Sequence, residues 1–130
     1  MATVRVNGLD LYYEQYGDAG PALIVAHGLM GSVALTKTYG EDLRAFAAKG
    51  VRVYAYDARG HGRSGFTKRR ADYRWSVLGD EMYGFIRALG LESVSVYGGS
   101  MGAGSALVCA SEHPEAVERL ILRSPPPFDG

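Results

Sequence analysis

The chain has 130 residues, of which 47% are hydrophobic, and its 14 basic and 14 acidic residues give no formal net charge. This length and composition suit one small domain with a packed core, and they give no indication of a nucleic-acid or anionic-membrane partner. Cys109 is the only cysteine, which excludes a disulfide within the chain, and we expect it to be a small buried side chain. Because the start lacks a signal-peptide pattern and no apolar run approaches about 18 residues, we expect a cytoplasmic protein.

The chain begins with a pattern typical of a β-hairpin. Apolar and polar residues alternate over 3–6 and 9–16, on either side of Asn7-Gly8, a dipeptide that favours two-residue turns. The following patterns alternate strands with helices, in this order: strand 22–26, helix 33–49, strand 51–56, loop 57–71, helix 75–89, strand 94–97, helix 101–112 and strand 117–122. This alternation after an opening hairpin predicts an α/β fold with a mostly parallel sheet.

A serine flanked by glycines follows the strand 94–97, in the run Gly98-Gly99-Ser100-Met101-Gly102. A G-x-S-x-G sequence between a strand and a helix is typical of a nucleophile elbow, a strained turn that lifts the serine hydroxyl above the edge of the sheet. A serine hydroxyl is a poor nucleophile until a base removes its proton. The sequence therefore predicts Ser100 as a nucleophile that needs an activating histidine.

Gly102 and Gly104 lie inside the predicted helix 101–112, where each glycine costs about 1 kcal/mol relative to alanine. We expect both to let the helix approach the sheet closely. A phosphate-binding loop is the competing glycine-rich interpretation, but the sequence lacks the lysine that such a loop requires.

Four features in order make the chain resemble the serine-nucleophile branch of the α/β-hydrolase fold family. They are His27-Gly28 after the third strand, the loop 57–64 (DARGHGRS) after the fourth, the elbow after the fifth, and the strand-to-proline exit at 120–127. The resemblance implies strands one to six of that fold without the last two strands and the cap. Residues 1–130 would then be the N-terminal portion of a single domain, ending at the cap insertion point.

The resemblance also implies roles for residues near the elbow. Ser100 would attack a carboxylic ester or a related acyl substrate and form an acyl-enzyme, while the backbone N–H groups of Leu29 and Met101 would bind the oxyanion. Five residues are expected to support these loops: His27, Gly28, Gly98, Gly99 and Gly102. We expect Asp57, which opens the loop after the fourth strand, to be structural.

None of the three histidines is expected to be the catalytic base. His27 belongs to the oxyanion loop, His61 to the glycine-containing loop, and His113 lies roughly 20 Å from Ser100 along the helix. In the family the triad acid and histidine follow later strands, which this chain lacks. Asp129 is a weak candidate for the acid because it lies past three prolines, five residues beyond the expected position.

We therefore expect a separate C-terminal chain of the same hydrolase, produced by a cut in or before the cap, to supply the acid and the base. An open sheet edge at 120–122 supports this expectation, since such an edge favours pairing with another strand. The alternative is a truncated, catalytically silent interaction module.

The same scaffold leaves other chemistries open. Cofactor-free perhydrolases or haloperoxidases, lactonases and carbon–carbon bond hydrolases share the serine elbow. Epoxide hydrolases and haloalkane dehalogenases are excluded by the resemblance because they carry aspartate at this position. No cofactor is expected, and no metal either, because the three histidines and one cysteine show no ligand spacing.

Overall fold

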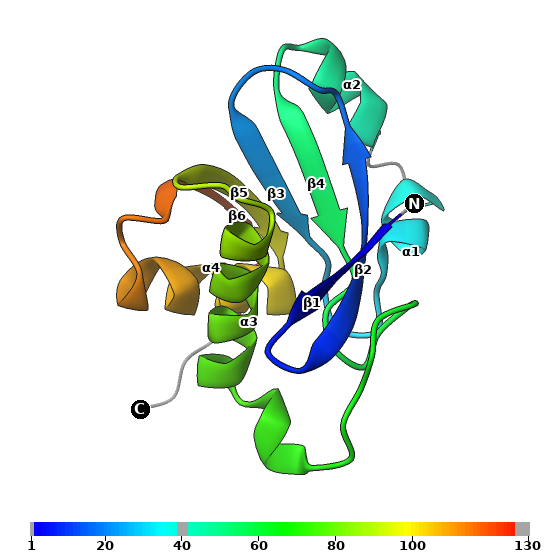
Figure 1. Ribbon diagram of the computed structural model, residues 1–130, viewed down its shortest axis with the longest axis vertical. Coiled ribbons are helices and arrows are strands. Elements are labelled where there is room, and N and C mark those ends of the chain that lie inside the picture. Colours follow the sequence, from blue (N-terminus) through cyan, green and yellow to red (C-terminus); the bar gives the residue numbers. More distant parts are fainter. Residues whose placement is uncertain (1, 39–41, 127–130) are drawn as a thin grey trace.

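The computed structural model describes residues 2–38 and 42–126 (Figure 1). Its elements in chain order are β1 (Ala2–Val6), β2 (Leu9–Tyr16), β3 (Ala22–Ala26), α1 (Val33–Thr38), α2 (Leu43–Ala48), β4 (Arg52–Tyr56), the 3-10 helix η1 (Arg70–Tyr73), α3 (Trp75–Ala88), β5 (Val94–Gly99), α4 (Met101–Glu112) and β6 (Val117–Arg123).

The strands of the described residues form one six-stranded sheet in the order β1-β2-β4-β3-β5-β6. β2 runs antiparallel to β1 and to β4, whereas the pairs β4–β3, β3–β5 and β5–β6 are parallel. The hairpin turn holds Asn7 and Gly8 at φ angles of 48° and 85°, the positive values that a two-residue turn requires. The α/β fold with its opening hairpin and mostly parallel sheet is confirmed.

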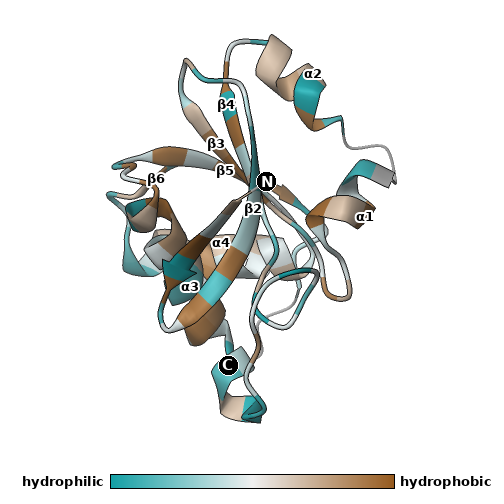
Figure 2. Ribbon diagram, turned by 45° about the vertical axis from the view of Figure 1, so that its right-hand side comes forward, coloured by the Kyte–Doolittle hydropathy of each residue, from teal (hydrophilic) through white to brown (hydrophobic). Residues whose placement is uncertain are grey.

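Helices cover both faces of the sheet because neighbouring strand residues point to opposite sides. Leu43 of α2 packs with Val25 and Val53 in one apolar cluster. Ile24 and Tyr54, each adjacent in sequence to a member of that cluster, belong to the larger cluster that includes residues of α3 and α4. Helices α1 and α2 carry both hydrophobic and hydrophilic stretches, as expected of helices with one buried side (Figure 2).

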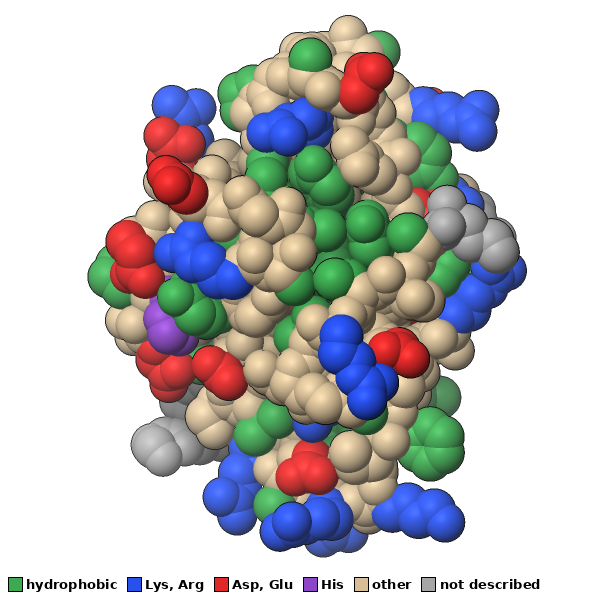
Figure 3. All heavy atoms as spheres, viewed as in Figure 1, with side chains coloured by type: hydrophobic (Ala, Val, Ile, Leu, Met, Phe, Trp, Pro, Cys, Tyr) green, Lys and Arg blue, Asp and Glu red, His purple; other side chains and the backbone are tan. Residues whose placement is uncertain are grey.

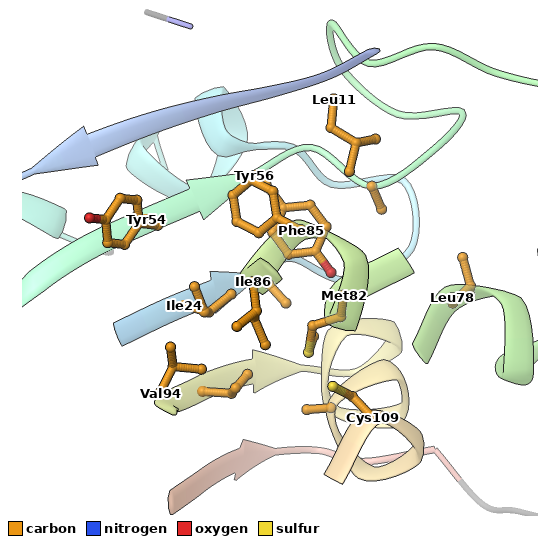
Figure 4. Packing of buried hydrophobic residues seen from close by; sticks show 14 of the residues in the cluster. Leu11, Ile24, Tyr54, Tyr56, Leu78, Met82, Phe85, Ile86, Val94 and Cys109 are labelled. Atoms are coloured by element: carbon orange, nitrogen blue, oxygen red, sulfur yellow. The ribbon is translucent and has the colours of Figure 1, made fainter. Parts of the chain in front are cut away.

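The larger cluster fixes α3 against the sheet. Phe85 stacks on Tyr56 with ring centroids 4.6 Å apart and meets Tyr13 edge-on at 5.5 Å. Met82 and Ile86 are fully buried beside it (Figure 4). Burial contributes about 1.5–3 kcal/mol for each side chain of this size, so α3 and the residues at its start are held firmly.

Two helices, α1 and α2, lie where one helix over 33–49 was predicted. The Asp42 carboxylate accepts hydrogen bonds from the N–H groups of Arg44 and Ala45, both at 3.1 Å, and this N-cap begins α2 as a separate helix. Residues 39–41 and 127–130, including Asp129, lie outside the described residues. Within the described part of the chain, no helix has the length and apolar character needed to cross a membrane.

Candidate active site

Ser100 occupies the sharp turn between β5 and α4. Its φ of 52° and ψ of −112° lie in a region that residues with side chains rarely adopt. Two backbone bonds hold the turn: Ser100 N–H donates to the Arg123 carbonyl at 2.9 Å, and Gly104 N–H donates to the Ser100 carbonyl at 3.0 Å. The side chain is exposed, and its hydroxyl has no hydrogen-bond partner among the described residues. The turn thus has the strained geometry expected of a nucleophile elbow.

Close backbone packing requires glycine at two positions of the elbow. A Cβ on Gly98 would lie 2.6 Å from the Gly102 carbonyl carbon, and a Cβ on Gly102 would lie 2.2 Å from the Ala26 carbonyl oxygen. Both contacts are with backbone atoms, which a rotating side chain cannot relieve. The start of α4 therefore lies directly against the end of β3, as the sequence predicted for Gly102.

Two other glycines near the elbow differ from expectation. A Cβ on Gly104 would lie 2.5 Å from the Trp75 ring, so Gly104 makes room for α3 and not for the sheet. Gly99 has open space around it, because a Cβ there would meet no atom within 4 Å. The structure therefore assigns no steric role to Gly99.

The turn after β3 faces the elbow. A Cβ on Gly28 would lie 3.3 Å from Ser100 Cβ and 3.9 Å from its Oγ. Gly31 N–H donates to the Gly28 carbonyl at 2.9 Å and closes a turn in which Met30 has a φ of 65°. The N–H of Leu29 is not used by this turn bond, and the Leu29 side chain is exposed.

Two backbone N–H groups expected to bind an oxyanion thus lie on segments next to Ser100. Leu29 directly follows Gly28, which lies against the serine, and Met101 is the first residue of α4. N–H groups in the first turn of a helix have no acceptor within the helix, and the helix dipole favours negative charge at that end. The arrangement suits stabilisation of an anion that develops beside Ser100.

His27 is buried, and partners occupy both of its ring nitrogens. Nε2 accepts a hydrogen bond from Ala58 N–H at 3.0 Å, which assigns the proton to Nδ1, 2.7 Å from the Gly28 carbonyl oxygen. Burial lowers the pKa of His27, and the bond to the Gly28 carbonyl offsets part of that change. His27 therefore joins the Gly28 turn to the loop after β4 and has no free nitrogen for the serine proton.

The loop after β4 folds around the buried carboxylate of Asp57. That carboxylate accepts hydrogen bonds from Val33 N–H at 2.7 Å and from Arg63 N–H at 2.9 Å. Gly62 has a φ of 51°, and a Cβ there would lie 2.1 Å from Asp57 Oδ2. Asp57 caps the start of α1 and shapes the loop, which agrees with its predicted structural role.

A buried ion pair between Arg59 and Glu81 is the main feature that sequence reasoning missed. Arg59 Nε lies 2.8 Å from Glu81 Oε1, and the two side chains are 6% and 1% exposed. Burial raises the pKa of Glu81, and hydrogen bonds from Arg59 counteract part of this rise. The spacing of Glu81 could have indicated that it is buried. It lies three residues after Leu78 and four before Phe85, on the apolar side of α3.

His61 was predicted only to shape its loop, but it also lies near the elbow. It lines a pocket together with Ser100, and its ring centroid is 5.0 Å from that of His27. Its Nδ1 lies 2.9 Å from the Arg59 carbonyl oxygen. No hydrogen bond joins it to Ser100 within the described residues.

The remaining histidine and the cysteine lie away from Ser100. His113 follows the last residue of α4, about 18 Å along the helix from its start, and stacks on Tyr83 with centroids 3.5 Å apart. Cys109 is buried, which raises the pKa of its thiol to about 12. In the part of the chain that the structure describes, no three His, Cys, Asp or Glu side chains are grouped to hold a metal ion.

Two pockets meet at Ser100, each with a volume of about 290 Å³. The first extends over the ends of β3 and β5 and reaches Thr36 of α1. The second, named here the apolar pocket, is lined mainly by aromatic and aliphatic side chains: Leu29, Tyr73, Trp75, Leu78 and Met101, with His61 beside them. Ser100 belongs to the lining of both pockets, so the apolar pocket lies directly beside this residue.

The model of the family described as alpha/beta hydrolase fold matches residues 21–130. The chain belongs to this family. The sheet with helices on both faces is therefore the architecture of an α/β hydrolase.

Individual relatives of this α/β hydrolase are enzymes of several kinds. It is 31% identical over 123 residues to the human serine hydrolase BPHL, a match covering 93% of this chain and 41% of that protein. It is 32% identical over 123 residues to N-formylmaleamate deformylase of Pseudomonas putida, covering 95% of this chain and 44% of that protein. The crystal structure of epoxide hydrolase A from Mycobacterium thermoresistibile aligns with a TM-score of 0.88 at 26% identity, covering 98% of this chain and 39% of that one.

The chain spans less than half the length of curated relatives such as the human serine hydrolase and the deformylase. The family and the fold are therefore shown for these residues. Of the activity, the relatives support only the general class, hydrolysis.

Proposed function

We propose that the protein is a serine hydrolase that cleaves a carboxylic ester or a related acyl substrate through an acyl-enzyme at Ser100. The strained elbow carries this proposal. A backbone of this kind costs of the order of 1–3 kcal/mol, and here it presents an exposed hydroxyl without a partner next to an apolar pocket. Residues 1–130 would form the N-terminal portion of a single hydrolase domain.

The proposed reaction has two halves. Ser100 Oγ forms a bond with the acyl carbon while its proton passes to a base, and the N–H groups of Leu29 and Met101 bind the oxyanion. The ester C–O bond then breaks, and the base returns the proton to the leaving alcohol. Water attacks the acyl-enzyme in the same manner and releases the carboxylic acid and the free serine.

We place the catalytic base and acid outside residues 1–130, in a C-terminal portion that binds as a separate chain. The histidines of the described residues support a base that lies outside them. His27 has both nitrogens occupied, His61 has no bond to Ser100, and His113 lies at the far end of α4. The greater length of the relatives leaves room for such a portion.

A fluorophosphonate probe tests the proposal, since it labels only activated serines. We expect the full-length protein to be labelled at Ser100 and to release 4-nitrophenol from 4-nitrophenyl butyrate. Ser100→Ala should abolish labelling and lower turnover by at least about 10³-fold. His113→Gln, at a histidine beyond the far end of α4, is the control and should keep both activities. A wild-type protein without label or turnover would refute the proposal.

Intact-mass measurement of the purified active protein tests the separate C-terminal chain. Two species that remain associated and sum to the full-length mass would support it. A single active species of full length would contradict this part of the proposal and leave the serine chemistry in place.

Hydrolysis of an N-formyl amide is a second candidate, which the similarity to the deformylase favours. The same attack of Ser100 on a formyl carbonyl would release formate and an amine. Comparing formate release from N-formylmaleamate with turnover of 4-nitrophenyl butyrate decides between the two substrate classes.

A further inference from the structure

Positive charge is concentrated in one segment of a chain that is neutral overall. Residues 67–74, named here the basic segment, contain four cations and one carboxylate, a net charge of +3, so the rest of the chain carries −3. The cations are Lys68, Arg69, Arg70 and Arg74. Figure 3 shows Lys and Arg side chains gathered at the lower end of the molecule, where Figure 1 places the segment between β4 and α3.

The four cations are exposed, and none forms an ion pair within residues 2–38 and 42–126. Arg59, by contrast, is buried against Glu81 at 2.8 Å and its charge is neutralised. Like charges crowded into so short a segment repel one another, and an anionic ligand would remove that repulsion. The segment is therefore suited to an external anion.

Hydrogen bonds hold the basic segment in one conformation. The Tyr73 hydroxyl donates to the Thr67 carbonyl at 2.9 Å and accepts from Thr67 N–H at 3.2 Å, which closes the segment into a loop. Arg59 Nη1 donates to the Asp72 carbonyl at 3.3 Å and ties the loop to the buried ion pair. The cations are thus presented on a fixed backbone, which lowers the entropy lost when a ligand binds.

The basic segment borders the apolar pocket. Tyr73 and Trp75 both line that pocket together with Ser100, and Arg74 lies between them in the chain. Arg70 precedes Tyr73 by three residues of 3-10 helix, a rise of about 6 Å. Neither arginine is among the residues that line the pocket, so a ligand held there would have to extend past Tyr73 to meet these charges.

We propose that the basic segment recognises an anionic group on the substrate, so that the enzyme prefers acyl esters that carry a carboxylate or phosphate at the end remote from the scissile bond. The apolar pocket would hold the hydrocarbon part, with its carbonyl at Ser100 and its charged end against Arg70 and Arg74. This inference rests on the proposed serine hydrolase function, and it names the substrate class of that site.

Esters with and without an anionic group at the end of the acyl chain test the inference in the full-length protein. The neutral ester is 4-nitrophenyl butyrate, and the anionic ones are mono-4-nitrophenyl glutarate and its analogue with a phosphonate in place of the free carboxylate. We expect kcat/KM to be about tenfold higher for at least one anionic ester at low ionic strength, and this preference should fall as salt is added. The two anionic arms show whether carboxylate or phosphate is preferred.

Neutralising the segment should remove the preference. A variant combining Arg69→Gln, Arg70→Gln and Arg74→Gln should lose about tenfold in kcat/KM for the preferred anionic ester and less than twofold for the neutral ester. Retained turnover of the neutral ester shows that this variant is folded. Lys49→Gln, at an exposed cation after α2 and at the other end of the molecule, is the matched control and should change neither rate (Figure 1).

Each remaining outcome overturns the inference in a recognisable way. Equal rates for charged and neutral esters, or a triple variant with unchanged preference, would refute it and leave the serine hydrolase function standing. Binding to vesicles that contain anionic lipid is measured for the wild type and the triple variant. If the triple variant lost this binding but kept the ester preference, the segment would be assigned to a membrane surface. A wild-type protein inactive on all three esters and unlabelled by fluorophosphonate would refute the proposed function itself.

Discussion

Ser100 holds its backbone at a φ of 52°, although glycine would adopt this conformation at little cost. Its neighbours make the strain possible. The start of α4 and the end of β6 fix the turn through hydrogen bonds, and Gly98 and Gly102 remove the atoms that would push α4 away from the sheet. A serine that had only to fill a turn would not need such support, so the strain is best explained by the position that it gives to the hydroxyl.

Gly102→Ala tests whether this close approach matters. The added Cβ would lie 2.2 Å from the Ala26 carbonyl oxygen, so α4 must shift from β3 and Met101 must move with it. Overpacking of this kind costs about 1–3 kcal/mol. We expect urea denaturation to show an unfolding free energy lower by about that amount, and fluorophosphonate labelling of Ser100 to slow.

Gly99→Ala is the matched control for that substitution, because its Cβ would meet no atom within 4 Å. We expect the unfolding free energy to change by less than about 0.5 kcal/mol. If both alanine variants were equally stable, close packing at Gly102 would not be the reason for glycine there.

Among the elements, the loop after β4 connects three separate parts of the fold. Asp57 accepts a hydrogen bond from the first residue of α1, and Arg59 pairs with Glu81 of α3. Ser64 Oγ accepts a hydrogen bond from Tyr12 N–H of β2 at 2.8 Å. The loop thus fixes the position of His61 and, through the carbonyl of Asp72, of the basic segment.

Glu81→Gln tests the strongest of these connections. Removing the carboxylate charge leaves Arg59 buried without a counter-ion, and breaking a buried pair in this way costs about 3–5 kcal/mol. We expect thermal and urea denaturation to show a loss of this size. Replacing both partners, as in Arg59→Met with Glu81→Leu, should recover much of it because no buried charge remains unpaired.

An exposed ion pair in the same protein is the control for Glu81→Gln. Arg5 and Asp10 lie 2.9 Å apart, but their side chains are 69% and 64% exposed. Asp10→Asn should therefore cost less than about 1 kcal/mol. Similar losses from the exposed and the buried pair would show that burial of Arg59 is not what makes its pairing important.

The elements and the elbow were predictable because each depends on residues close in sequence. The hairpin follows from Asn7-Gly8, and the strand-to-helix turn follows from the glycines around Ser100. Contacts between distant residues were not predictable in the same way. Gly104 packs on Trp75, 29 residues earlier, and nothing local to either residue indicates which surface the other presents.

At the scale of the whole molecule, two titratable groups join separate elements and make stability depend on pH. His27 links the end of β3 to the loop after β4, and Glu14 of β2 binds Lys37 of α1 at 2.7 Å. Burial raises the pKa of Glu14, but hydrogen bonds from Lys37 and two tyrosines lower it by more than burial raises it. The net result is a pKa that falls from 4.5 to about 2. Its contribution to stability is therefore complete above pH 4.5 and is lost as the pH falls towards 2.

As the pH falls, His27 should lower the stability at a higher pH than Glu14 does. Because burial places its folded pKa below 6.5, the unfolded chain binds a proton below pH 6.5 that the folded protein does not take up. Unfolding free energy should fall as the pH decreases from 6.5 to that lower pKa, by at most about 1.4 kcal/mol per pH unit.

Urea denaturation at a series of pH values measures this slope. His27→Gln, whose side-chain carbonyl can still accept from Ala58 N–H, should reduce the slope. A slope that survives in His27→Gln would place the proton on another group and would contradict the neutral, doubly bonded His27 on which the Gly28 turn depends.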